Sequence, residues 1–138
     1  MAEKYTENAE DVILIGHSSG AQASLRYAEL YPVHACVLVS ATYTDLGDAH
    51  ERASGYYPVL SNDGQEQNPY DFDKMKTNCN HWHQFHSDND PFIPLYEAER
   101  IRSGLDLSSE TFHVLPGRSH FFEFSPEVLD VVLSLTNI

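Results

Sequence analysis

The sequence has few basic residues, and this shortage excludes two classes of partner. Only 8 of its 138 residues are lysine or arginine, against 21 acidic residues, so the formal net charge is −13. Such a surface repels phosphate backbones and anionic lipids, and no run of lysine or arginine offsets the repulsion. We therefore expect no nucleic-acid partner and no membrane partner.

Cysteines and long apolar runs are scarce as well. The two cysteines, Cys36 and Cys79, are too few for a disulfide framework, so we expect free thiols in a reducing compartment. The start of the chain is polar and lacks the apolar core of a signal peptide. The longest apolar runs, at 12–15 and 35–39, are too short to cross a bilayer. The expected location is the cytoplasm.

What is present suits one folded domain, residues 1–138, because 41% of the residues are hydrophobic and 12% are aromatic. Apolar runs predict two buried strands, at 11–15 and 34–40, and two further strands are expected at 81–85 and 111–115. Helical patterns predict four helices, at 21–31, 70–78, 95–103 and 125–135. Strands that alternate with helices in this way favour an α/β fold with a parallel sheet flanked by helices.

Residues 41–69 are rich in glycine, serine, asparagine, aspartate and tyrosine, and they predict a long irregular connection. Loops of this length usually have a function, so we expect a lid or a loop that faces the substrate. Tyr56 and Tyr57 are candidates for lining the substrate pocket, although they could equally pack the loop against itself. Phe92 and Phe121, further along the chain, are two more pocket candidates.

The motif Gly-x-Ser-x-Gly occupies Gly16, His17, Ser18, Ser19 and Gly20, directly after a predicted strand and before a predicted helix. In that context a sharp strand-to-helix turn lifts the serine oxygen above the sheet, and small flanking residues let the backbone bend tightly. We therefore assign Ser18 as a nucleophile and the backbone N–H of Ser19 as one oxyanion donor. The alternative is a helix cap that is rich in serine and glycine.

A serine nucleophile needs a base and a carboxylate that orients the base. In the fold that uses this motif, the acid and then the histidine follow the serine, each on a loop after a later strand. Asp90 and His120 have that order and that context. Taken alone, Asp90 fits a turn before proline and His120 fits a loop histidine packed on Phe121 and Phe122. Together with the serine, they predict a Ser-His-Asp triad.

A second group, Cys79, His81, His83 and His86, has the side-chain types of a metal site. On a strand, the first three would share one face and His86 would point away. No second cluster of ligands is evident, so a zinc site is the weaker interpretation. We expect neither a metal nor another cofactor.

Four stretches of the chain resemble the retinoblastoma-binding protein 9 family of small serine hydrolases. They read ILIGHSSGAQASLRYAE, VLVSATYTDLGDAHERASGYY, QFHSDNDPFIP and GRSHFFE. The resemblance runs from about residue 11 to the C-terminus and is most specific between residues 16 and 56. It implies an α/β-hydrolase fold without a large cap domain. It also implies hydrolysis of small ester or amide substrates, with aminoacyl esters and amides as the best-attested class.

The resemblance also places the family's catalytic residues on three positions of this chain. The nucleophile falls on Ser18, the base on His120, and the acid on the aspartate before Pro-Phe, which is Asp90. Where relatives can have two adjacent aspartates, this chain has Asn89 and then Asp90, which favours Asp90 as the acid.

Three departures from the family change what we expect. Relatives have an N-terminal segment ahead of the motif strand, so we expect this chain to lack the first strands and a second oxyanion donor from an early loop. Relatives bind the retinoblastoma protein through a Leu-x-Cys-x-Glu motif, and this chain has none, reading ENAED at 7–11. Retinoblastoma-protein binding is therefore not carried over. Residues 59–70 resemble an insertion.

Two hypotheses follow from the sequence. The first is a serine hydrolase that forms an acyl-enzyme on Ser18, with weak activity because one oxyanion donor is missing. The second is a truncated variant that keeps the motif without catalytic competence and acts, if at all, as an interaction protein.

Overall fold

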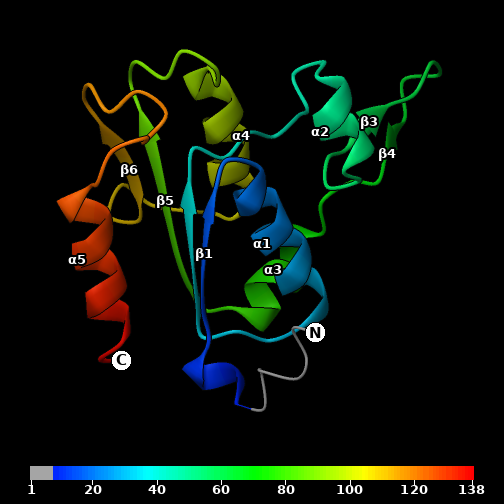
Figure 1. Ribbon diagram of the computed structural model, residues 1–138. Helices are drawn as coiled ribbons and strands as arrows, with labels where there is room; N and C mark the ends of the chain where they lie inside the picture. Colours follow the sequence, from blue (N-terminus) through cyan, green and yellow to red (C-terminus); the bar gives the residue numbers. More distant parts are fainter. Residues whose placement is uncertain (1–7) are drawn as a thin grey trace.

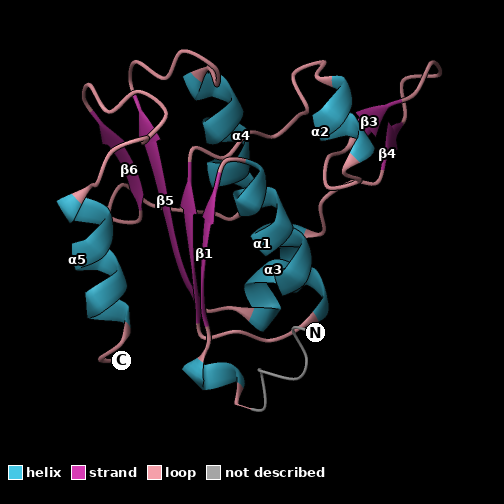
Figure 2. Ribbon diagram, viewed as in Figure 1, coloured by secondary structure: helices cyan, strands magenta, loops and turns pink. Residues whose placement is uncertain are grey.

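A computed structural model describes residues 8–138 and confirms the α/β architecture expected from the sequence (Figure 1, Figure 2). The parallel sheet has the strand order β1-β2-β5-β6. Its strands are β1 (Ile13–His17), β2 (Ala35–Val39), β5 (His81–Ser87) and β6 (Phe112–Leu115). The helices beside it are α1 (Ser19–Leu30), α3 (Phe72–Asn78), α4 (Leu95–Gly104) and α5 (Pro126–Leu135). A short 3-10 turn, Ala9–Asp11, precedes β1.

The helices cover the two faces of the sheet unequally (Figure 1). Helices α1, α3 and α4 pack on one face, where Leu25, Trp82 and Ile101 belong to the larger hydrophobic core. On the other face, α5 packs over a smaller core that includes Phe85 and Leu135. Burial of apolar surface on both faces is what stabilises a parallel sheet.

Strand β1 lies at one edge of the sheet, and the prediction that it is fully buried is wrong for the described residues. Its hydrogen-bonded neighbour is β2, which is buried throughout. Ile13 and Leu14 are half-buried, and Ile15 is 55% exposed. An apolar run predicts burial only if other elements cover both faces and both edges of the strand.

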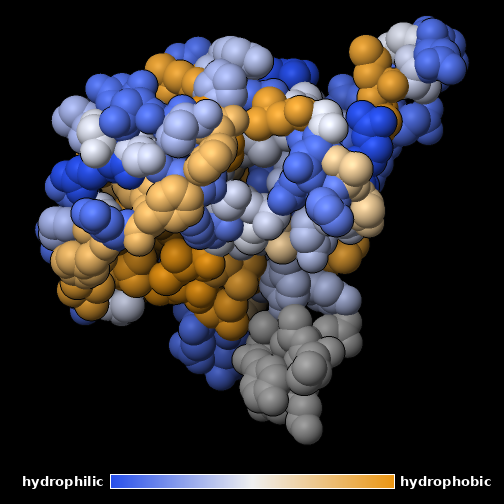
Figure 3. Space-filling model, turned by 45° about the horizontal axis from the view of Figure 1, so that its top comes forward, coloured by the Kyte–Doolittle hydropathy of each residue, from blue (hydrophilic) through white to orange (hydrophobic). Residues whose placement is uncertain are grey.

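An apolar cleft of about 320 Å³ lies between the end of β1 and α5, and Ile15, Phe124, Val128 and Leu129 are among its lining residues. Figure 3 shows hydrophobic side chains gathered into a broad patch on one part of the visible surface. Among the residues that the structure describes, no helix has the length and apolar character needed to cross a membrane.

The segment 41–69 is not the irregular connection that the sequence predicts. It contains α2 (Ala49–Ala53) and an antiparallel hairpin of β3 (Val59–Leu60) and β4 (Glu66–Gln67). Figure 1 shows that α2 and the hairpin project from the body of the molecule. These elements were missed because helices and strands of this length are too short to give a periodic pattern.

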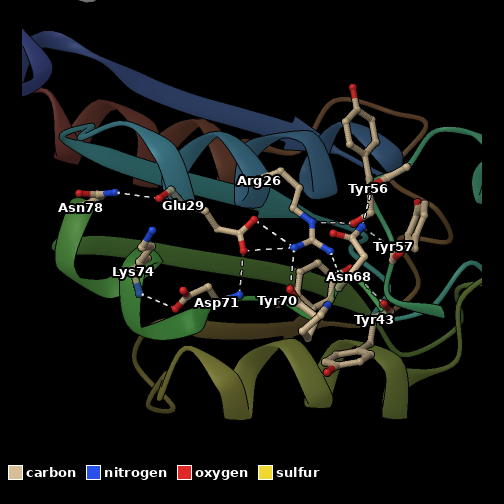
Figure 4. A network of polar contacts seen from close by, with 12 residues as sticks. Arg26, Glu29, Tyr43, Tyr56, Tyr57, Asn68, Tyr70, Asp71, Lys74 and Asn78 are labelled. Atoms are coloured by element: carbon tan, nitrogen blue, oxygen red, sulfur yellow. Dashed lines mark hydrogen bonds and ion pairs between the residues drawn. The ribbon is translucent and has the colours of Figure 1, made fainter. Parts of the chain in front are cut away.

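Arg26 on α1 attaches this projecting segment to the body (Figure 4). Its guanidinium donates hydrogen bonds to the backbone carbonyls of Tyr56 (2.9 Å), Asn68 (2.6 Å) and Pro69 (2.9 Å). It also pairs with Glu29 at 3.0 Å. The planar guanidinium presents several donors at fixed angles, so one side chain can hold several backbone positions. The segment is thereby fixed to the helix that follows the Gly-x-Ser-x-Gly motif.

Candidate active site

Ser18 lies at the turn between β1 and α1 and has the backbone of a sharp elbow. Its φ is 58° and its ψ is −123°, a combination that is rare for residues other than glycine. The N–H of Ser18 donates to the Val39 carbonyl at 2.8 Å, and its own carbonyl accepts the Ala21 N–H at 2.9 Å. The neighbouring strand and the following helix therefore hold the turn from both sides.

The two glycines of the motif have different steric roles. A Cβ atom on Gly16 would lie 2.3 Å from the Gly20 carbonyl oxygen and 2.7 Å from the Cα of Ala21. Only glycine therefore lets β1 and α1 approach each other this closely. A Cβ atom on Gly20 would meet no atom within 4 Å. Steric crowding thus requires glycine at the first glycine of the motif, Gly16, and not at the second, Gly20.

Asp90 and His120 lie on the loops after β5 and β6 and contact each other. His120 Nδ1–H donates to Asp90 Oδ2 at 2.9 Å, and Asp90 Oδ1 accepts the backbone N–H groups of Phe92 (2.8 Å) and Ile93 (3.0 Å). The Asp90 side chain has no exposed surface, and that of His120 is 9% exposed. A buried carboxylate with three donors is held in one orientation, so it also fixes the orientation and the tautomer of the imidazole.

Two other residues of the loop after β5 hold the backbone of the loop after β6, which is called the histidine loop below. Asp88 Oδ1 accepts the Gly117 N–H at 3.0 Å, and Asn89 Oδ1 accepts the Ser119 N–H at 2.8 Å. Asp88 thus binds the main chain of the loop after β6, and among the described residues no hydrogen bond or ion pair joins it to the imidazole. Of the two aspartates in this loop, the one that reaches the imidazole is Asp90.

Ser18 and His120 line the same cavity, which has a volume of about 420 Å³. It lies beyond the carboxyl ends of the parallel strands, where open α/β sheets usually bind ligands. Its other lining residues come from the segment around α2 and from the loop after β5: Thr42, Asp45, Leu46, Asp48, Glu51, Tyr57, Pro91, Phe92 and Ile93.

No hydrogen bond joins Ser18 Oγ to His120 Nε2 among the described residues. Catalytic contacts of this kind often tighten only when substrate binds.

His17 and Ser19 flank the elbow on either side. His17 Nε2–H donates to the backbone carbonyl of His120 at 2.6 Å, and the two rings lie 4.9 Å apart. His17 therefore connects the elbow to the histidine loop. Ser19 is the first residue of α1, so its N–H is one of the terminal groups that has no acceptor within the helix.

The four aromatic residues predicted to line the pocket separate into two pairs. Tyr57 and Phe92 line the cavity that contains Ser18. Tyr56 is outside that lining, and its backbone carbonyl accepts from Arg26. Phe121 lines the apolar cleft beside α5 instead.

The wall of this cavity contains three carboxylates that were not predicted from the sequence, namely Asp45, Asp48 and Glu51. The available signal was the density of acidic residues at 45–51, inside the segment expected to face the substrate. Because α2 was not predicted, the sequence spacing of these acidic residues could not show which of their side chains point toward the cavity.

The cysteine and histidines weighed as metal ligands do not converge on one point. Cys79 Sγ lies 3.4 Å from the His81 carbonyl oxygen, and His83 Nδ1 lies 3.0 Å from His113 Nε2. His86 is buried, and its Nε2–H donates to a backbone carbonyl at 2.9 Å. Within residues 8–138, no group of three or more histidine, cysteine, aspartate or glutamate side chains could hold a metal ion.

No model of a known protein family matches the chain. Among curated proteins, serine hydrolase RBBP9 of Rattus norvegicus is 44% identical over 128 residues. The match covers 91% of this chain and 62% of the rat protein, so the chain spans about three fifths of the length of this relative.

Solved structures agree on the fold. The product of the ydeN gene from B. subtilis superimposes with a TM-score of 0.71 at 22% identity, covering 94% of this chain and 67% of that chain. Esterase PE8 superimposes with a TM-score of 0.58 at 18% identity, covering 99% of this chain and 55% of that chain. At these identities the superpositions establish the fold alone. The chain is thus a homologue of the serine hydrolase RBBP9, with the α/β-hydrolase fold.

Proposed function

We propose that the chain is a serine hydrolase that cleaves small esters or amides, aminoacyl esters and amides included, through Ser18, His120 and Asp90. One observation carries the proposal: His120 shares a cavity with Ser18 and is oriented by the buried carboxylate of Asp90. Homology to a serine hydrolase supports the assignment. A cavity of about 420 Å³ suits a small substrate.

The reaction proceeds in two halves. Ser18 Oγ bonds to the substrate carbonyl carbon while its proton moves to His120 Nε2. His120 then gives this proton to the leaving alcohol or amine as the old bond breaks, which leaves an acyl group on Ser18. Water attacks the acyl carbon with His120 again as base, and the proton returns to Ser18 as the acid leaves. Asp90 accepts the His120 Nδ1–H and stabilises the imidazolium.

The carbonyl oxygen becomes negative in each half-reaction and needs hydrogen-bond donors. The Ser19 N–H supplies one donor, and its place at the positive end of the α1 dipole strengthens the interaction. A donor of this kind is typically worth about 10²–10³ in rate.

A fluorophosphonate probe tests the nucleophile directly, because it reacts with an activated serine. We expect labelling of the unsubstituted chain, loss of labelling in Ser18→Ala, and retention in Ser19→Ala, which keeps the backbone N–H. Asp90→Asn should lower ester hydrolysis by about 10⁴-fold, and Asp88→Asn should lower it far less. Labelling that survives Ser18→Ala, or greater damage from Asp88→Asn, would refute the assignment.

A further inference from the structure

The cavity that holds Ser18 and His120 is negatively charged. Three carboxylates line it, and its lining residues include no lysine or arginine. One of the three, Asp45, is already neutralised, because Arg52 Nε donates to it at 2.9 Å and the Gly47 N–H donates at 2.8 Å. The uncompensated charge therefore belongs to the other two carboxylates.

Asp48 and Glu51 each keep one oxygen without a partner among the described residues. Asp48 Oδ1 accepts the Glu51 N–H at 3.0 Å and caps α2, and Glu51 Oε2 accepts the Tyr57 hydroxyl at 2.8 Å. Burial, together with the Glu51 carboxylate, raises the pKa of Tyr57, so its hydroxyl stays protonated and continues to donate. Both carboxylates are thus held in place by one oxygen while the second oxygen remains available.

The other lining groups of the cavity also suit a cationic ligand. Phe92 is 59% exposed and lines the cavity, so an aromatic side chain is available beside a cation bound there. His120 is more than nine-tenths buried and lines the same cavity, and its Nε2 has no hydrogen-bond partner among the described residues. That unpartnered nitrogen marks where the reacting group of a ligand would lie.

We propose that Asp48 and Glu51 make this cavity selective for substrates that carry a cationic group, such as an ammonium, away from the scissile carbonyl. This inference rests on the proposed function, because it takes the carbonyl to be bound between Ser18 and His120. An anionic substrate would meet two uncompensated carboxylates here and a formal net charge of −13 on the whole chain.

Two matched pairs of esters isolate the charge from the shape. For the acyl side, p-nitrophenyl 4-(trimethylammonio)butanoate is compared with p-nitrophenyl 5,5-dimethylhexanoate. For the leaving-group side, acetylthiocholine is compared with 3,3-dimethylbutyl thioacetate. Within each pair, a quaternary nitrogen replaces a quaternary carbon and nothing else changes. We expect the cationic member of at least one pair to have a kcat/KM about tenfold higher, and expect the preference to shrink at high salt.

Substitutions that keep the hydrogen bonds show whether the two carboxylates cause the preference. Asp48→Asn still provides a helix-capping oxygen, and Glu51→Gln still provides an acceptor for the Tyr57 hydroxyl. Each should lower the ratio of cationic to neutral kcat/KM by about two- to fivefold, and the double variant should lower it further. Glu99→Gln removes the same charge from an exposed position on α4 outside the cavity and should leave the ratio unchanged.

The possible outcomes separate this inference from the proposed function. Equal or faster hydrolysis of the neutral member in both pairs would overturn the inference, and so would a preference that survives the double variant. Labelling of Ser18 by the fluorophosphonate without hydrolysis of either cationic ester would overturn the inference alone. Failure of the probe to label Ser18 would overturn the proposed function, and the inference with it.

Discussion

Replacing Gly16 by alanine should damage the elbow, whereas the same replacement at Gly20 should not. The new Cβ at Gly16 would lie 2.3 Å from a backbone oxygen. Carbon and oxygen atoms that are not bonded need roughly 1 Å more than this. Because the obstacle is the main chain of α1, no side-chain rotation relieves it, and the helix start must move away from β1.

The expected cost can be stated for both stability and activity. Overpacking of this kind costs about 1–3 kcal/mol of unfolding free energy. For a chain of this length, that is a fall in Tm of about 3–12 °C. A displacement of about 1 Å at Ser18, the proposed nucleophile, can cost about 10²-fold in rate. Gly20→Ala enters open space in the first turn of a helix and should be neutral or stabilising by up to about 1 kcal/mol.

Thermal unfolding followed by circular dichroism, together with fluorophosphonate labelling, checks both effects. The steric argument predicts a lower Tm and slower labelling for Gly16→Ala alone. A Gly16→Ala chain with unchanged Tm and an unchanged labelling rate would refute it. An equal loss of Tm and of labelling rate in Gly20→Ala would also refute it. That result would mean that the motif needs its glycines for backbone flexibility and not for the close approach of β1 and α1.

Three further predictions concern parts of the molecule outside the proposed catalytic residues. Arg26→Ala removes the donors that hold the projecting segment, so limited proteolysis within residues 59–68 should be faster, and an unchanged cleavage rate would contradict this role. Burial lowers the pKa of His83 and of His113 below the usual 6.5, so both rings bind fewer protons folded than unfolded. The contribution of these two rings to the free energy of unfolding should therefore be fully present above about pH 6.5 and should fall as the pH drops below it. Urea unfolding at pH 7.5 and at pH 5.5 measures this fall, and replacing both histidines by glutamine should reduce it. Ile15→Lys on the exposed edge of β1 should reduce self-association of the 138-residue polypeptide in size-exclusion chromatography, and a monomeric unsubstituted polypeptide would contradict that expectation.

The elements that sequence predicts best are the longer ones, which show an apolar run or a helical pattern. All four strands of the parallel sheet and the four longer helices begin and end within two residues of their predicted bounds. Local context also sufficed for Ser18, because a glycine-bounded serine between a strand and a helix predicts the elbow that its φ of 58° displays. These features depend on residues close together in the chain.

What the sequence could not predict depends on contacts between distant segments. The attachment of the projecting hairpin rests on Arg26, more than 40 positions before the carbonyls of Asn68 and Pro69 that it binds. The burial of β1 depends on what lies beside the strand, and its own residues do not encode this. The acidic wall depends on how α2 is turned, and a helix of five residues has no periodicity to reveal its orientation.

The geometry of the histidine loop shows how such distant contacts produce a site. His120 lies between Ser119 and Phe121, which both have left-handed backbone, with φ values of 55° and 56°. Such a conformation costs of order 1 kcal/mol for each residue and persists only where the surroundings determine it. Here Asn89 accepts the Ser119 N–H, and Asp90 holds the imidazole. The loop after β5 therefore fixes both the strained backbone and the imidazole of the loop after β6, so the orientation of the proposed base is set before any substrate arrives.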